Sequence, residues 1–156
     1  MRKDEFIDFV FLDSCAFDPD NEKEAAAIDQ LFLLHERNII CLEIPFAVNE
    51  EIEHPNTPYQ KKARALGLIR SIGLRPDQAE LELFLKILAA LTGNGKRENY
   101  RRDALHLYES SKYMQDFITH DKRILRRRAR LEALCKIRIL RPSEYLEQIS
   151  KKIQSL

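Results

Sequence analysis

The chain has 156 residues, 44% of them hydrophobic, with no apolar run near the roughly 20 residues that cross a bilayer and no apolar signal region in its first residues, MRKDEF. We therefore expect a soluble, cytoplasmic protein with a single domain over residues 1–156, large enough to bury a core. Its net charge of +1 conceals an asymmetry: residues 1–60 carry 14 Asp/Glu and 4 Lys/Arg, a balance of −10, whereas residues 61–156 carry 11 and 22, a balance of +11. Such segregation fits either a cation site beside a polyanion-binding surface or two separate solvated faces.

In the N-terminal half, short apolar runs bounded by turn-forming residues predict strands, and apolar residues at helical spacing predict helices. The expected strands are 9–12 and 38–44. The expected helices are 20–37, 46–53, which Pro45 opens, and 61–72, which ends at Gly73.

In the C-terminal half, the same patterns predict the strands 116–119 and 136–140 and the helices 76–91, 100–112, 122–134 and 143–152. The apolar stripe of the helix 76–91 is expected to be Leu81, Phe84, Leu85, Leu88 and Leu91. Strands thus alternate with helices, which predicts a three-layer α/β/α fold with a mostly parallel central sheet of four to five strands and a core over about 9–145. A small further strand in the central helical region is compatible with this fold.

Acidic residues from distant parts of the sequence are predicted to meet at one edge of the sheet. Asp13 and Asp121 each follow a strand, whereas Asp103 and the pair Glu50 and Glu51 lie in the first turns of helices. In a parallel sheet, helices begin at the edge where strands end. Each acid has an alternative role as a helix cap or a partner of the helix dipole. Together, their repulsion calls for a cation, and oxygen ligands favour Mg²⁺ or Mn²⁺ over zinc.

Four segments that carry these acids resemble the PIN-domain nucleases, over about 9–145. They are FLDSCAF (11–17), IPFAVNEEI (44–52), RRDALHLYESSKY (101–113) and FITHDKRIL (117–125). The resemblance implies a metal-dependent ribonuclease whose metal ligands are Asp13, Glu51, Asp103 and Asp121, with Thr119 in support. Glu51 is preferred over Glu50 because the glutamate of the family is usually followed by an apolar residue, here Ile52.

The three cysteines, Cys15, Cys41 and Cys135, are in no metal-ligand spacing and are predicted to be free thiols. Cys15 also departs from the family pattern, in which the second residue after the first aspartate is usually Asn or Ser. This departure leaves its place in the site open.

Basic residues flank the predicted carboxylate cluster. Arg101 and Arg102 directly precede Asp103, and Lys122 and Arg123 follow Asp121. We expect these four, with His120, to contact nucleic acid. Within the predicted helix 122–134, one face collects Arg123, Arg126, Arg127 and Arg130, as either a nucleic-acid track or a solvated face.

The resemblance also bears on partners. It implies RNA as the substrate, a small antitoxin protein if the chain is the toxin of a toxin–antitoxin pair, and a homodimer, since members of the family often form dimers. Two other functions fit the same residues. One is a non-catalytic PIN-like module that binds nucleic acid or acts as a scaffold, and the other is a metal-dependent phosphatase acting on small phosphates.

Overall fold

The structure, a computed structural model, describes residues 6–46, 52–65, 68–70 and 76–156. Its centre is a parallel sheet of five strands in the order β3-β2-β1-β4-β5. The strands are β1 (Asp8–Leu12), β2 (Ile40–Ile44), β3 (Ile69–Arg70), β4 (Asp116–Ile118) and β5 (Ile139–Leu140). In the register, Phe11 of β1 pairs with Glu43 on one side and with Phe117 on the other.

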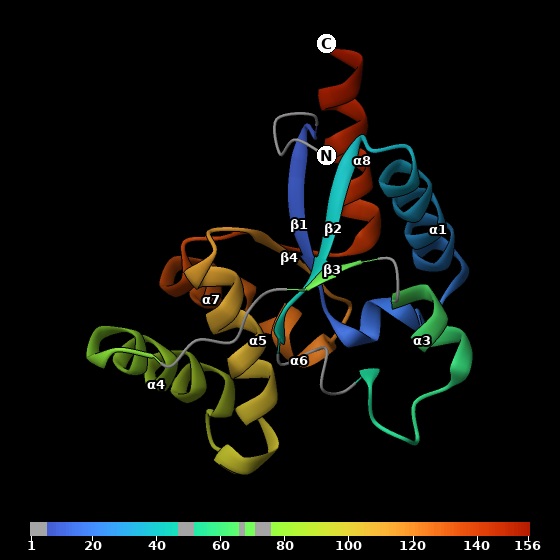
Figure 1. The fold of residues 1–156 in the computed structure, drawn as a ribbon. Helices are drawn as coiled ribbons and strands as arrows, with labels where there is room; N and C mark the ends of the chain where they lie inside the picture. The colour runs from blue at the N-terminus through green and yellow to red at the C-terminus, as the bar shows by residue number, and fades with distance from the viewer. Residues whose placement is uncertain (1–5, 47–51, 66–67, 71–75) are drawn as a thin grey trace.

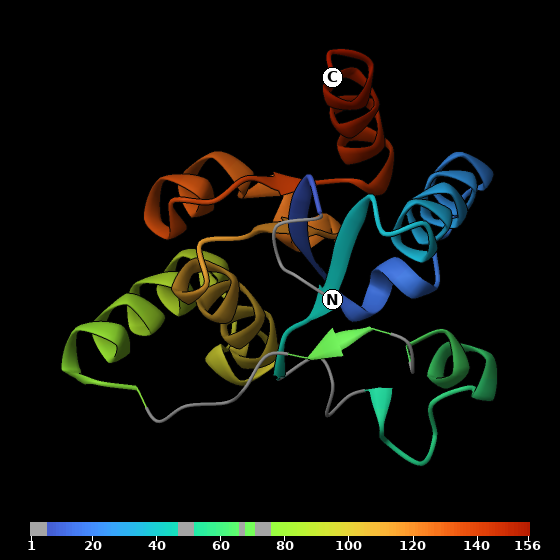
Figure 2. The ribbon, with the colours of Figure 1, turned by 45° about the horizontal axis from the view of Figure 1, so that its top comes forward.

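Helices cover both faces of the sheet, as Figures 1 and 2 show. They are α1 (Glu22–Glu36), α3 (Tyr59–Ala65), α4 (Gln78–Thr92), α5 (Arg101–Lys112), α6 (Lys122–Arg126), α7 (Arg128–Cys135) and α8 (Pro142–Gln154). Two short 3-10 helices are η2 (Ser14–Phe17) and η3 (Arg97–Asn99). α1 packs against α8 on one side, and α4 packs against α5 and α7 on the other. The predicted three-layer α/β/α architecture with a parallel sheet is therefore confirmed.

The alternation of side chains along the strands divides the core between the two faces. In β1, Val10 and Leu12 join the cluster beneath α1 and α8, whereas Phe11 joins the cluster beneath α4, α5 and α7. In β4, Ile118 and Phe117 divide in the same way. Successive residues of a strand point to opposite faces, so a sheet covered on both sides needs apolar residues at consecutive positions.

The predicted helix 61–72 is wrong at 68–70, the described part of its second half. α3 ends at Ala65, and Ile69–Arg70 forms β3, which pairs with β2 through Glu43 and Ile44. Backbone hydrogen bonds to the edge of β2 favour an extended chain here. This segment supplies the short further strand that the fold could accommodate.

The predicted helix 122–134 is also wrong, because the chain breaks it at Arg127. This residue has φ −108° and ψ 16°, which ends α6 before α7 begins. Ile124 of α6 and Leu131 of α7 both join the same core cluster.

Other boundaries and faces differ less from the predictions. α4 starts at Gln78 because the side chain of Asp77 accepts a hydrogen bond from Glu80 N. Its predicted stripe is partly wrong, since Leu81 and Leu85 are 41% and 45% exposed. The buried residues of this helix are Phe84, Ile87, Leu88, Ala90, Leu91 and Thr92.

Near the C-terminus, Ile149 of α8 is buried in the cluster that α1 also joins. Most of the predicted helix 46–53 lies outside the described residues. None of the described helices is both long and apolar enough to cross a membrane.

Candidate functional site

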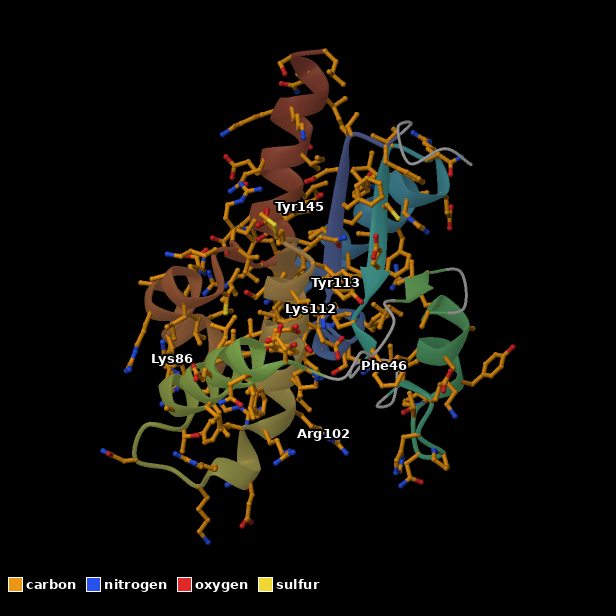
Figure 3. The ribbon with its side chains drawn as sticks, turned by 60° about the vertical axis from the view of Figure 1, so that its left-hand side comes forward. Phe46, Lys86, Arg102, Lys112, Tyr113 and Tyr145 are labelled. Carbon is orange, nitrogen blue, oxygen red and sulfur yellow. The ribbon has the colours of Figure 1, made fainter. Side chains whose placement is uncertain are left out.

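The carboxyl ends of β1 and β4 lie side by side and carry Asp13 and Asp121. Asp13 N donates to Ile118 O at 2.9 Å, which extends the pairing of these strands by one residue. Asp103 comes from the first turn of α5. Figure 3 follows this helix from Arg102 at its lower end to Lys112 above, and the strands run the opposite way in Figure 1. The topology therefore brings three distant acids to one edge of the sheet.

Asp13 is 3% exposed and is held by four contacts. Its Oδ1 accepts from Ser14 N at 2.7 Å and lies 3.2 Å from His106 Nδ1. Its Oδ2 accepts from Thr119 Oγ1 at 2.8 Å and from Cys15 Sγ at 3.3 Å. Burial alone would raise the pKa of Asp13, but the contacts with His106, Thr119 and Cys15 outweigh it and lower the pKa. Asp13 is therefore an ionised carboxylate at neutral pH, in a fixed orientation.

Thr119 ties the ends of β1 and β4 together. Its hydroxyl donates to Asp13, and the same oxygen accepts from Asp121 N at 3.1 Å. The side chain is fully buried. Thr119 therefore supports the two acids from behind rather than facing a ligand.

Cys15, whose place the sequence leaves open, lies inside this group of contacts. Its sulfur is 3.2 Å from Thr119 Oγ1 as well as 3.3 Å from Asp13 Oδ2. Burial, followed by the charge of Asp13, raises the pKa of the thiol far above its ordinary value. Cys15 is thus a protonated donor to Asp13. Cys15, Cys41 and Cys135 are free thiols, as predicted.

The spacing of His106, three residues after Asp103, fits either a residue that borders the site or a histidine of the core. The side chain is 1% exposed and lies beside Asp13 Oδ1. Residues three apart share a side of a helix, so one turn of α5 presents both Asp103 and His106 to the sheet edge.

Asp103 and Asp121 both form an ion pair with the guanidinium group of Arg123. Arg123 Nη2 lies 3.0 Å from Asp103 Oδ2 and 3.1 Å from Asp121 Oδ2. Asp121 Oδ1 accepts from Arg123 N at 2.8 Å and so caps α6 as well. Burial, followed by the charges of Asp13 and Asp121, raises the pKa of Asp103 to about 6, despite the opposing charge of Arg123. The three acids are therefore close enough to repel one another.

The chemistry of these donors fits a hard divalent cation, although their present arrangement does not enclose one. Asp103 Oδ2 is buried, and among the described residues it accepts no well-directed hydrogen bond, only the ion pair. In the described part of the chain, no three Asp, Glu, His or Cys side chains are grouped so that they could hold a metal. Arg123 occupies the space between two of the acids. Glu50 and Glu51 lie outside the described residues.

The predicted nucleic-acid residues divide into three groups. Arg101 and Arg102 are exposed on the first turn of α5, and Figure 3 shows Arg102 at the lower end of this helix. His120 and Lys122 line a cavity of about 240 Å³ whose other lining residues are Asp20, Asn21, Glu24, Leu125 and Arg141. Arg123 instead contacts the carboxylates.

The single basic face predicted for the helix 122–134 does not exist, because the helix breaks at Arg127. The guanidinium groups of Arg123 and Arg127 lie 5.5 and 6.0 Å from the centre of the Tyr100 ring. Arg126 turns back, and its Nε donates to Lys122 O. Arg123 and Arg127 therefore form a pair beside Tyr100, which Arg126 does not join.

The fold and the site together define an α/β protein with a carboxylate cluster at the carboxyl end of a parallel sheet. The sequence matches no protein-family model, and no curated protein matches it. Among solved structures, it is similar to a chain in a structure of FitAB bound to an IR36 DNA fragment. That similarity has a TM-score of 0.47 and 14% identity, and it covers 86% of this chain and 95% of the other.

Proposed function

We propose that the chain is a PIN-like, Mg²⁺- or Mn²⁺-dependent ribonuclease that hydrolyses phosphodiester bonds at this carboxylate cluster. The observation that carries the proposal is the convergence of Asp13, Asp103 and Asp121 from three separate elements. Burial, followed by the charges of Asp13 and Asp121, raises the pKa of Asp103 to about 6. Acids that repel one another at a sheet edge persist where a cation compensates them.

In this proposal, Asp13, Asp103 and Asp121 hold the metal together with Glu51. A bound Mg²⁺ or Mn²⁺ supplies a nucleophilic water at neutral pH and neutralises phosphate oxygens. Thr119 and Cys15 fix the orientation of the Asp13 carboxylate through their hydrogen bonds. Arg101 and Arg102, exposed on the first turn of α5, and Lys122, next to Asp121 in the chain, offer positive charge that suits a phosphate backbone.

Cleavage of a single-stranded RNA by the purified protein in Mn²⁺ tests the proposal. We expect Asp121→Asn to reduce the rate by at least about tenfold, because loss of a residue that only supports a metal ligand typically costs roughly 10–100-fold. The matched control is Asp116→Asn, at the opposite end of β4, which should leave the rate within about twofold. Full Mn²⁺-dependent cleavage by Asp121→Asn would overturn the assignment.

The other functions give different results in the same assay. A non-catalytic PIN-like module binds RNA but neither cleaves it nor binds Mn²⁺. A phosphatase of small phosphates hydrolyses a model ester equally well after Arg101 and Arg102 are both replaced by Gln, whereas a ribonuclease loses RNA cleavage in that variant.

We further propose that the nuclease is the toxin of a toxin–antitoxin pair. Growth arrest on overexpression, relieved by a small neighbouring antitoxin, would support this role.

A further inference from the structure

Arg123 is positioned to act as a cation of the site rather than as an ordinary surface residue. Its Nη2 atom contacts carboxylate oxygens of two different elements, Asp103 of α5 and Asp121 at the start of α6. Its backbone N–H is held by the same Asp121. The side chain therefore starts at a fixed point beside the cluster and reaches back over it.

The surroundings explain why a cation is favoured at this position. The acids facing it are Asp103 and Asp121, with Asp13 behind them, and the flanking His106 and Thr119 are committed to Asp13. Like charges so close together need compensation, and the guanidinium provides it. The same oxygens are the ones that a divalent cation would use, so the two cations compete for them.

An aromatic ring beside Arg123 can hold the guanidinium after a metal displaces it from the carboxylates. The Arg123 side chain is 44% exposed, so no packed core holds it in place. The face of the Tyr100 ring lies 5.5 Å from its guanidinium carbon, and a guanidinium is attracted to an aromatic face. The group can thus leave the carboxylates and remain next to the site.

We infer that the Arg123 guanidinium is a tethered counter-cation of Asp103 and Asp121, which a divalent cation must displace to bind. The inference rests on the proposed function, because it concerns the same carboxylates. The affinity for a divalent cation then depends on how strongly the Arg123 guanidinium holds the same carboxylates. The guanidinium also offsets part of the negative charge of the cluster when no metal is bound.

Calorimetric titration of the metal-free protein with Mn²⁺ tests this competition without measuring cleavage. Arg123→Gln should tighten the Mn²⁺ dissociation constant about tenfold, within the usual range of coupling between two bound groups. Arg123→Lys, which keeps the charge, should fall between this variant and the wild type. The matched control is Arg126→Gln, one turn along α6 and bound to Lys122 O, which should change the constant less than twofold.

The possible outcomes distinguish a failure of this inference from a failure of the proposed ribonuclease function. If Arg123→Gln and Arg126→Gln bind Mn²⁺ with equal affinity while the wild type binds it and cleaves RNA, the competition is wrong and the ribonuclease stands. If neither the wild type nor any variant binds Mn²⁺, both proposals are wrong. A tighter constant in Arg123→Gln alone supports the inference. Circular dichroism of each variant confirms that it is folded.

Discussion

At the scale of single residues, the contacts of two carboxylates in the site shift their pKa values in opposite directions. Asp13 is surrounded by donors, which lower its pKa, whereas Asp103 faces other acids, and its pKa is about 6. The two residues lie at the same edge of the sheet, so the difference arises from their contacts and not from depth alone. A cation at this edge therefore relieves mainly the charge on Asp103.

This difference predicts that Asp103→Asn stabilises the metal-free protein at alkaline pH. The carboxyl pKa rises from 3.8 in the unfolded chain to about 6 on folding, so the folded state binds more protons between these values. Its stability contribution is thus lost as pH rises through that window. We expect Asp103→Asn to raise the free energy of unfolding by about 2 kcal/mol at pH 8 and by much less at pH 4.

Urea denaturation in EDTA at the two pH values measures this effect. The ion pair with Arg123 offsets part of the repulsion, so Asp103→Asn also removes a favourable contact. The net result still favours Asn, because the raised pKa already includes that pair. An Asp103→Asn protein that is less stable than the wild type at pH 8 would contradict the prediction.

The sequence was enough to place Asp13, Asp103 and Asp121 at one edge, because strand ends and helix starts follow from local patterns. It was not enough to assign Cys15 or Arg123. A thiol next to the first aspartate and an arginine after the last one have no fixed role until the tertiary contacts of their side chains are known. Arg123 belongs to a basic run by sequence, yet it contacts acids from two elements.

At the scale of elements, the alternation of strands and helices and the parallel sheet were predictable, whereas some element bounds and the buried face of α4 were not. β3 is two residues long and exists because β2 offers it an edge, which no local periodicity reveals. The break at Arg127 is similar, since both α6 and α7 contain helix-forming residues. In both segments, contacts with distant residues outweigh local preference.

One pair of elements depends on a buried polar contact. Glu24 of α1 is 4% exposed, and it accepts from Ser143 N at 2.9 Å and from Ser143 Oγ at 2.6 Å at the start of α8. We predict that Glu24→Ala lowers the free energy of unfolding by about 3 kcal/mol, because a charged acceptor is lost and a buried N–H is left unpaired. Urea denaturation measures it.

The matched comparison uses Ser143→Ala, which removes the hydroxyl but leaves the backbone donor. In that background, Glu24→Ala should cost about 1 kcal/mol less than in the wild type, since one of the two hydrogen bonds is already missing. An equal cost in both backgrounds would show that the hydroxyl contact contributes nothing to joining α1 and α8.

At the scale of the whole molecule, part of the charge asymmetry is neutralised within the fold. Lys61 pairs with Asp18 at 2.8 Å, and Arg64 pairs with Asp29, so α3 places basic residues against the acidic N-terminal part. Most of the remaining basic residues follow residue 95. Several of these also form ion pairs, such as Lys112 with Glu80 and Arg138 with Asp116. The asymmetry along the sequence is therefore partly cancelled by ion pairs in the fold, and neither of the two initial alternatives describes it fully.

A divalent cation bound at this edge should stabilise the whole fold, because it links α5 to the end of β4. A ligand at a hundred times its dissociation constant adds about 2.7 kcal/mol to the free energy of unfolding. For a chain of this length, that corresponds to a rise in Tm of roughly 5–10 °C, measured by thermal denaturation in Mn²⁺ and in EDTA. Asp121→Asn should abolish most of the rise. Asp29→Asn, on the exposed side of α1, should keep it. Equal rises in both variants would mean that Mn²⁺ acts elsewhere on the surface.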